Sequence, residues 1–166
     1  MIIRLTGKLG RKLRISPSES LPLSSNPYTD WSANLFTVKR YQYILAVNTP
    51  SLYNVLFPGR GVASGSDLLE RMTDELKRML LLDGYQFIMD RIISSHTGEI
   101  SFSKSYSRTV TGSMTEMMKM AKLYLGEDEL DPFDVAVHLN GTIMNALENM
   151  YPRREFVSEN MRDLYG

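Results

Sequence analysis

The sequence contains no cysteine, and this absence excludes several kinds of chemistry at once. Such a chain forms no disulfide bonds, offers no thiolate ligands to a zinc finger or ribbon, and has no cysteine nucleophile. Histidine is almost as scarce, because only His96 and His138 are present. Two isolated imidazoles do not make a metal site, so we predict no metal and no cofactor. A disulfide-free chain of this size fits a reducing compartment, and we expect a cytoplasmic protein.

Long apolar runs are missing as well. No stretch approaches the roughly 20 apolar residues of a membrane helix, and Arg4 interrupts the apolar start that a signal peptide needs. We therefore expect no membrane contact. The 166 residues, 43% hydrophobic and 23% charged, are typical of one globular domain. We predict a single domain over residues 1–166, with a mobile Pro- and Ser-rich loop at 16–30 and a mobile tail at 151–166.

The net charge is zero, but the charges are unevenly distributed. Residues 1–61 hold eight basic and two acidic residues, a net charge of +6, and residues 62–166 hold 11 basic and 17 acidic residues, a net charge of −6. Two interpretations stay open: a basic binding face, or two halves that attract each other weakly through solvent. The candidate nucleic-acid-binding residues are Lys8, Arg11, Lys12, Arg14, Lys39 and Arg40, with Trp31, Tyr41 and Tyr43 as stacking surfaces.

Hydrophobic periodicity predicts an α+β protein. Alternating or β-branched runs predict strands over residues 1–6, 31–38, 41–49, 52–57 and 98–106. Helical spacing of apolar residues predicts helices over 7–15, 66–82, 85–93, 113–125 and 156–165, and one that opens at Asp131-Pro132 and buries residues as far as Leu147. Because regular βαβ alternation is missing, we expect a mainly antiparallel sheet of about five strands, with helices packed on one face.

The segment from Arg108 to Glu116 combines a charge, a bend and a predicted helix start. Ser113 and Glu116 have the spacing of a capping box, which predicts that the helix begins at Ser113. A helix N-terminus presents free N–H groups and partial positive charge, and with Arg108 beside it this end could hold a phosphate or carboxylate. The alternative is that Arg108 pairs with an acid and the polar residues only cap the helix.

The same segment carries a resemblance to a known family. Ser107-Arg-Thr-Val-Thr-Gly-Ser-Met-Thr-Glu116 is similar to the Asn-Arg-Ser-Val-x-Gly-Ser-Met-Asn-Asp stretch of a bacterial family catalogued as a domain of unknown function. The resemblance extends to Lys8–Leu13, to Trp31-Ser-Ala-Asn-Leu35 and to Ser51-Leu-Tyr53. It implies an association with mobile gene cassettes and no particular activity. The signature positions that it implies are Trp31, Asn34, Arg108, Gly112, Ser113 and Met114.

No complete catalytic motif is present, and we predict no catalytic residues. Ser113 lacks the G-x-S-x-G frame of a nucleophile elbow, and Pro58-Gly-Arg-Gly61 matches no phosphate loop. The leading hypothesis is a non-enzymatic binding or accessory module, homodimeric through its methionine-rich helices. One alternative is a nucleic-acid-binding accessory or antitoxin-like protein that acts through its basic N-terminal region. The other is an enzyme or binder of an anionic ligand, with the ligand-binding residues Arg108, Gly112, Ser113, Trp31 and Asn34.

Overall fold

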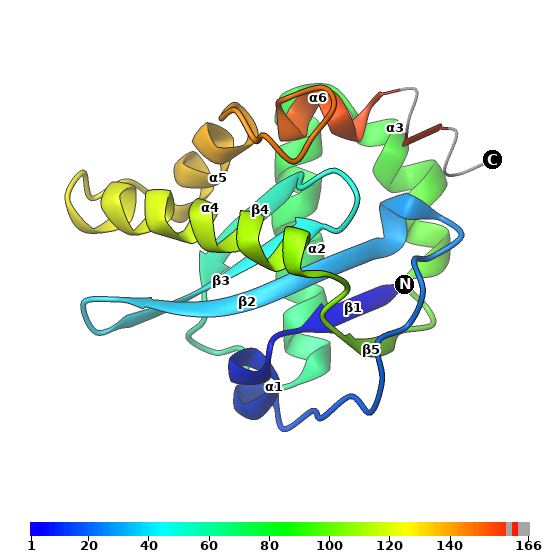
Figure 1. Cartoon of the computed structure of the whole chain (residues 1–166), viewed down its shortest axis with the longest axis horizontal. Coiled ribbons are helices and arrows are strands. Elements are labelled where there is room, and N and C mark those ends of the chain that lie inside the picture. The colour runs from blue at the N-terminus through cyan, green and yellow to red at the C-terminus, as the bar shows by residue number, and fades with distance from the viewer. Residues whose placement is uncertain (159–160, 163–166) are drawn as a thin grey trace.

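A five-stranded sheet forms the centre of the protein, seen in a computed structural model that describes residues 1–158 and 161–162 (Figure 1). The strand order is β4-β3-β2-β1-β5. β1 runs parallel to both of its neighbours, β2 and β5, whereas β2, β3 and β4 form an antiparallel meander. The strands are β1 (Ile2–Leu5), β2 (Asp30–Val38), β3 (Tyr41–Asn48), β4 (Asn54–Pro58) and β5 (Ser101–Lys104).

The predicted α+β class and strand number are confirmed, and the sheet is mixed, with more antiparallel than parallel pairing. The parallel pairs arise because long crossovers separate β1 from its partners, and residues 6–29 alone provide enough chain to return to the same end of the sheet. Alternation of apolar residues reports which residues share a face, but not the direction of a neighbouring strand. The sequence pattern therefore predicted the strands but not the parallel pairs.

In residues 1–158, six α-helices surround the sheet, together with short 3-10 turns at Pro27–Thr29 and Ser94–His96 and a π-helical turn at Met89–Ile93. Residues 85–93 were predicted as one helix, and they divide between α3 and the π turn. The helices are α1 (Gly7–Leu13), α2 (Gly65–Asp83), α3 (Gln86–Ile88), α4 (Arg108–Gly126), α5 (Pro132–Asn140) and α6 (Pro152–Phe156).

The helices cover both faces of the sheet, so the prediction that they pack on one face is wrong. Figure 1 shows α4 in front of the sheet and α2 behind it. Phe102 shares the face of Ile3 and Trp31, and its ring lies against Gly65 at the start of α2. Val38 points to the opposite face, against Gly126 of α4. Consecutive residues are therefore buried along Ile44–Asn48 and Asn54–Phe57, as in strands that are covered on both sides.

Capping residues define where the long helices begin and end. Ser64 and Asp67 form a capping box at the start of α2, and Gly84, with a φ of 79°, ends it as the Asp83-Gly84 pair predicted. α4 starts at Arg108 rather than at the predicted Ser113, because the Ser107 side chain accepts a hydrogen bond from the Val110 N–H. Ser113 therefore lies in the helix interior and caps nothing.

The C-terminal helices are shorter than predicted. α5 begins at Asp131-Pro132 as predicted, but it ends at Asn140, before Gly141, so the segment up to Leu147 is not helical as a whole. α6 starts at Pro152, before the predicted start at residue 156, and Pro152 occupies its first turn. Residues 159–160 and 163–166 of the predicted tail helix lie outside the described residues.

A fully buried ion pair ties the long segment after α1 to the sheet. Arg4 Nε and Nη2 donate to the two carboxylate oxygens of Asp30, over 2.7 and 2.8 Å, and neither side chain is exposed. The remaining guanidinium N–H groups donate to the carbonyl oxygens of Leu21 and Pro22 and to Ser103 Oγ. Arg4 thereby joins β1, β2, β5 and the Pro- and Ser-rich segment through a single side chain.

Aromatic residues close the core beside the end of α2. The Phe156 ring stacks on Tyr53 with centroids 4.3 Å apart and meets Tyr28 edge-on at 5.2 Å. The Tyr53 hydroxyl donates to Asp83 Oδ2 over 2.6 Å, and Arg153 Nε donates to Asp83 Oδ1 over 2.9 Å. α6 is thus fastened to α2 and β4 by both packing and charge. In the described part of the chain, no helix has the length and apolar character to cross a membrane.

Candidate binding sites

The five residues proposed for ligand binding fall into two groups. Trp31 and Asn34 are three residues apart on β2, so their side chains point to opposite faces of the sheet. Trp31 is completely buried, and its Nε1 donates to the Tyr28 carbonyl oxygen over 2.9 Å. Asn34 Oδ1 accepts hydrogen bonds from Thr6 Oγ1 and the Leu35 N–H. The contacts of both residues are internal to the fold.

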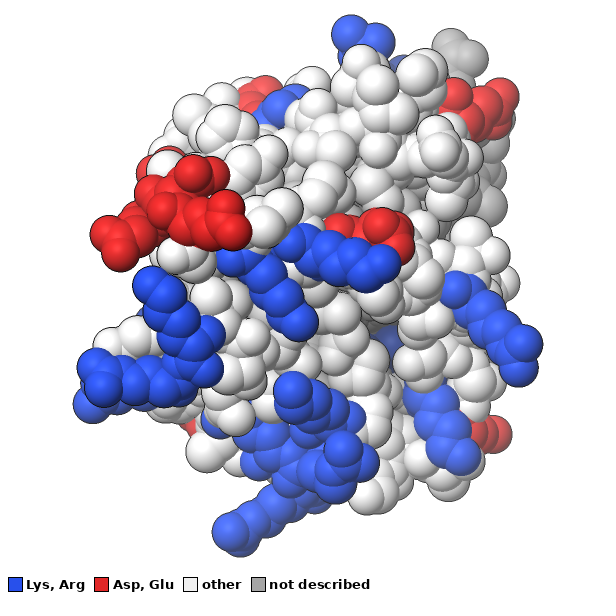
Figure 2. Space-filling model, turned by 60° about the vertical axis from the view of Figure 1, so that its left-hand side comes forward, with Lys and Arg blue, Asp and Glu red and all other residues white. Residues whose placement is uncertain are grey.

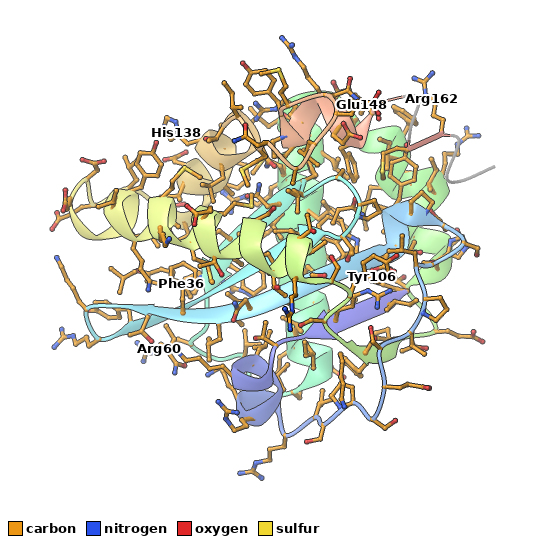
Figure 3. All side chains as sticks on the ribbon, viewed as in Figure 1. Phe36, Arg60, Tyr106, His138, Glu148 and Arg162 are labelled. Carbon is orange, nitrogen blue, oxygen red and sulfur yellow. The ribbon has the colours of Figure 1, made fainter. Side chains whose placement is uncertain are left out.

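Arg108, Gly112 and Ser113 do come together, in a hollow of about 520 Å³ that we call the α4 cleft. One wall is the face of α4 that carries these residues, and the other is the segment Thr142–Ala146 after α5. A smaller hollow of about 200 Å³ adjoins it, shares Ser113 with it, and extends to Tyr106. Figure 3 shows Tyr106 beside the start of α4. Because the second wall comes from a distant part of the chain, local sequence patterns did not indicate the cleft.

The α4 cleft has one cationic end and an apolar wall. Arg108 is exposed and forms no ion pair among the described residues. Glu116 also lines the cleft, but Lys119 Nζ donates to its carboxylate over 2.9 Å. The predicted alternative, that Arg108 pairs with an acid, is therefore not what the structure has. The apolar lining comes from Met120, Ile143, Met144 and Ala146.

The basic residues of the N-terminal region form a second candidate site, at the end of the sheet where α1 meets the β2–β3 turn. Gln42 connects three segments there: its Oε1 accepts from Lys12 Nζ over 3.0 Å, and its carbonyl oxygen accepts from the Gly59 N–H over 2.7 Å. Arg60 follows Gly59, and Figure 3 shows it below the β2–β3 hairpin and near α1. We define the basic face as Lys8, Arg11, Lys12, Arg14, Lys39, Arg40 and Arg60.

None of the seven cations of the basic face is paired with an acid in the part of the chain that the structure describes. The ion pairs there involve Arg4, Arg78, Lys119 and Arg153. Figure 2 shows Lys and Arg side chains gathered over the lower part of the molecule, with acidic groups above them. Arg60 was not among the predicted residues, although it belongs to the segment with a net charge of +6.

Of the three predicted stacking residues, Tyr41 alone is freely presented. It is 53% exposed, and the Arg40 guanidinium lies 5.3 Å from its ring centroid. Tyr43 packs against Phe36 at 5.9 Å, and Trp31 is in the core. The aromatic surface next to the basic face is therefore limited to the hairpin.

Neither histidine lines the α4 cleft or belongs to the basic face. His96 Nδ1 lies 3.0 Å from the carbonyl oxygen of Ile92, and the His138 ring stacks on Tyr124 at 5.3 Å. Across residues 1–158 and 161–162, no three His, Cys, Asp or Glu side chains are grouped so as to hold a metal ion.

Comparison with known protein families gives a match over most of the chain. A family model described as "Domain of unknown function (DUF6933)" matches residues 2–155, which is most of the chain and includes both the α4 cleft and the basic face. A search of curated proteins found no match. The predicted resemblance to a domain-of-unknown-function family is thereby confirmed.

Proposed function

The chain belongs to the DUF6933 family, a domain of unknown function, and from its own residues we propose that it is a non-enzymatic binding module whose basic face holds nucleic acid. The observation that carries this proposal is the convergence of seven cations from three chain segments, none of them paired with an acid among the residues that the structure describes. This face corresponds to the basic N-terminal region predicted for a nucleic-acid partner. The phosphate backbone is the polyanion that such a surface recognises, by releasing counterions.

The geometry of the basic face favours contact with the phosphate backbone of a nucleic acid over recognition of individual bases. The cations stand on a short helix and on turns, at an end of the sheet rather than on one long exposed helix. Tyr41 is the one exposed ring of the hairpin available to stack on a base, beside Arg40. We therefore infer binding with little sequence preference and strong dependence on salt, as an accessory protein would show.

The test is fluorescence anisotropy with a labelled duplex and a labelled single-stranded oligonucleotide, over about 50 to 200 mM salt. We expect affinity to fall steeply with salt, by a slope of about −0.9 per phosphate contacted on duplex DNA. Replacing the four cations of α1 and its C-cap with glutamine should reduce that slope by about 3 to 4. The variant is Lys8→Gln, Arg11→Gln, Lys12→Gln and Arg14→Gln.

The matched control removes four exposed cations outside the basic face and changes the net charge equally: Arg71→Gln, Lys77→Gln, Arg91→Gln and Lys122→Gln. We expect it to keep most of the affinity and the salt slope of the wild-type protein. Absent or salt-independent binding would rule out the proposal. An equal loss in both variants would show that net charge, and not this face, is responsible.

Two backbone positions allow charge to be removed without weakening the fold. Arg14 and Lys39 have left-handed φ values of 58° and 53°, which are unfavourable for L-residues by about 1–2 kcal/mol. Glycine adopts this conformation readily. We expect Arg14→Gly and Lys39→Gly to leave the melting temperature unchanged or higher and each to weaken oligonucleotide binding. A loss of binding in these variants cannot then be assigned to misfolding.

We also propose a homodimer, but not one whose contact is made by the methionine side chains of α2 and α4. Met114 and Met117 of α4 and Met72 and Met79 of α2 are buried in the core. The exposed large apolar residues that lie close in sequence are Leu81 and Leu82 at the end of α2 and Phe87 in α3. Cytoplasmic location, bacterial origin and a mobile gene cassette remain proposals that rest on composition and on the family resemblance.

A further inference from the structure

Gly112 occupies a helix interior that gives no steric reason for glycine. It lies in the second turn of α4, where glycine is less favourable than any other residue except proline. Apart from its chain neighbours and the nearby backbone of α4 itself, a Cβ placed on Gly112 would meet no atom within 4 Å, and its φ lies outside the left-handed region. Packing within the protein therefore does not need this glycine. The space left by its missing side chain belongs to the α4 cleft, which Gly112 lines.

Ser113, the next residue, presents its hydroxyl to the cleft. The residue as a whole is only 9% exposed, and its Oγ forms no hydrogen bond with any described residue. Among those residues, the buried side-chain polar atom without a partner is Asn54 Oδ1, so the Ser113 Oγ is not sealed in the core. Ser113 lines both the α4 cleft and the smaller hollow beside it. A ligand in the cleft can therefore form a hydrogen bond with this hydroxyl.

The lining of the cleft defines the chemistry of that ligand. Arg108 provides an unpaired guanidinium, which binds carboxylates and similar oxyanions through two parallel N–H groups. The acid in the wall, Glu116, is already neutralised by Lys119. Opposite α4, Ile143 and Met144 offer an apolar surface. The volume of about 520 Å³ lies within the range of small-molecule sites.

We propose that the α4 cleft binds a small amphipathic anion, with its charged group at Arg108, a hydrogen bond to Ser113 and its apolar body over Gly112 against the segment Thr142–Ala146. This site is separate from the basic face, and it does not depend on nucleic-acid binding. The ligand class follows from the cationic end, the accessible hydroxyl and the apolar wall taken together.

The experiment uses the fluorescent anion 8-anilinonaphthalene-1-sulfonate as the probe, with octanoate as a competitor. The wild-type protein should bind the probe at one site, and octanoate should displace it. Gly112→Leu fills the cleft with a side chain that favours helix, so the melting temperature should stay the same or rise while probe affinity falls at least about tenfold. Arg108→Ala should also weaken the binding of both anions.

Matched controls keep each change on α4 but outside the cleft. Thr115→Leu adds the same side chain at an exposed position, and Lys122→Ala removes an exposed cation. Both should bind the probe as the wild type does, and so should the variant with four glutamines in and after α1. Oligonucleotide binding should be unchanged in Gly112→Leu, which separates this proposal from that for the basic face.

Three results would overturn the proposal. The first is a wild-type protein that does not bind the probe. The second is full binding in Gly112→Leu and Arg108→Ala. The third is an equal loss in Thr115→Leu and Lys122→Ala, which would place the probe on the outer surface of α4 or make its binding a response to net charge.

Discussion

At the scale of single residues, the Arg4–Asp30 pair is the most demanding feature of the core. Two fully buried charges are tolerated only because each guanidinium N–H and both carboxylate oxygens are hydrogen-bonded. Asp30→Asn keeps the shape but leaves the Arg4 charge without a counterion. We expect it to lower the free energy of unfolding by about 3–5 kcal/mol, measured by urea denaturation.

The control for this prediction is Lys119→Gln, which breaks the exposed pair with Glu116. It should change the free energy of unfolding by less than about 1 kcal/mol, because solvent screens such pairs. If Asp30→Asn were as mild as this control, the buried pair would not have the structural role assigned to it.

Tyr53 makes stability sensitive to alkaline pH. Burial raises the pKa of the Tyr53 hydroxyl well above its ordinary value, and the hydrogen bond to Asp83 raises the pKa further. Because the folded state prefers the protonated phenol, this contribution is complete below about pH 10, where tyrosine titrates in unfolded chains. Above that pH it is lost progressively. The melting temperature of the wild type should therefore fall as the pH rises through this range.

Tyr53→Phe removes the titrating group. At neutral pH it should lower stability by about 1 kcal/mol, for the lost hydrogen bond to Asp83. Its melting temperature should then fall less steeply than that of the wild type above about pH 10. Tyr41→Phe, at an exposed ring, is the control and should leave the stability at neutral pH unchanged. Equal alkaline slopes in wild type and Tyr53→Phe would contradict the assignment.

At the scale of elements, the start of α4 distinguishes two serines with different roles. Ser107 is the N-cap, and Ser107→Ala should lower the free energy of unfolding by about 1 kcal/mol. Ser113→Ala removes a hydroxyl that caps nothing and forms no hydrogen bond with a described residue, so stability should stay the same or rise. Urea denaturation measures the free energy of unfolding of both variants. A larger loss in Ser113→Ala than in Ser107→Ala would place the helix start at Ser113.

The elements that the sequence predicted well are those whose signals are local. The apolar face and the Asp83-Gly84 stop placed α2 within two residues of its ends, and Asp131-Pro132 marked the start of α5. The start of α4 was misplaced because Ser107 has no acidic residue three positions later, whereas Ser113 has Glu116 and imitates a capping box. Strand direction and the covering of both faces depend on contacts between distant segments, which periodicity does not contain.

The candidate sites show the same difference between local signals, which the sequence contains, and contacts between distant segments, which it does not. Arg108, Gly112 and Ser113 are neighbours on one helix, so a local motif found them together, but the opposite wall at residues 142–146 was unpredictable. Trp31 and Asn34 belong to the resemblance, and their contacts explain them as internal residues. Arg60 joins the basic face only through the Gln42 contacts, which follow from the pairing of β3 with β4.

At the scale of the whole molecule, both edges of the sheet are partly occupied, which restricts how two copies can associate. On β4, Asn140 Oδ1 accepts from the Asn54 N–H, Asn140 Nδ2 donates to the Asn54 carbonyl oxygen, and Pro58 has no N–H to offer. On β5, the Lys104 N–H donates to the Glu19 carbonyl oxygen. Strand pairing between copies is therefore disfavoured, and a dimer must use helices.

We expect a dimer by size-exclusion chromatography with light scattering, with its contact at the end of α2 and at α3. Leu82→Glu with Phe87→Glu should convert it to a monomer, because charges would be buried at an apolar contact. Leu123→Glu, at an equally exposed position on α4, should stay dimeric. If the wild-type protein were monomeric at high micromolar concentration, the homodimer proposal would be ruled out.

The central position of β1 in the sheet also determines the order in which the strands can pair during translation. β2, β3 and β4 form a meander of neighbouring strands that can pair as soon as they leave the ribosome. β1 is made before them, yet its second partner is β5, and Ile2 meets Ser101 only after α2 has been translated. Pairings between such distant segments form slowly because a long loop must close first. β1 precedes β2 in the chain and yet is among the last strands to be completed, because its β5 side stays unpaired until residues 101–104 have been made.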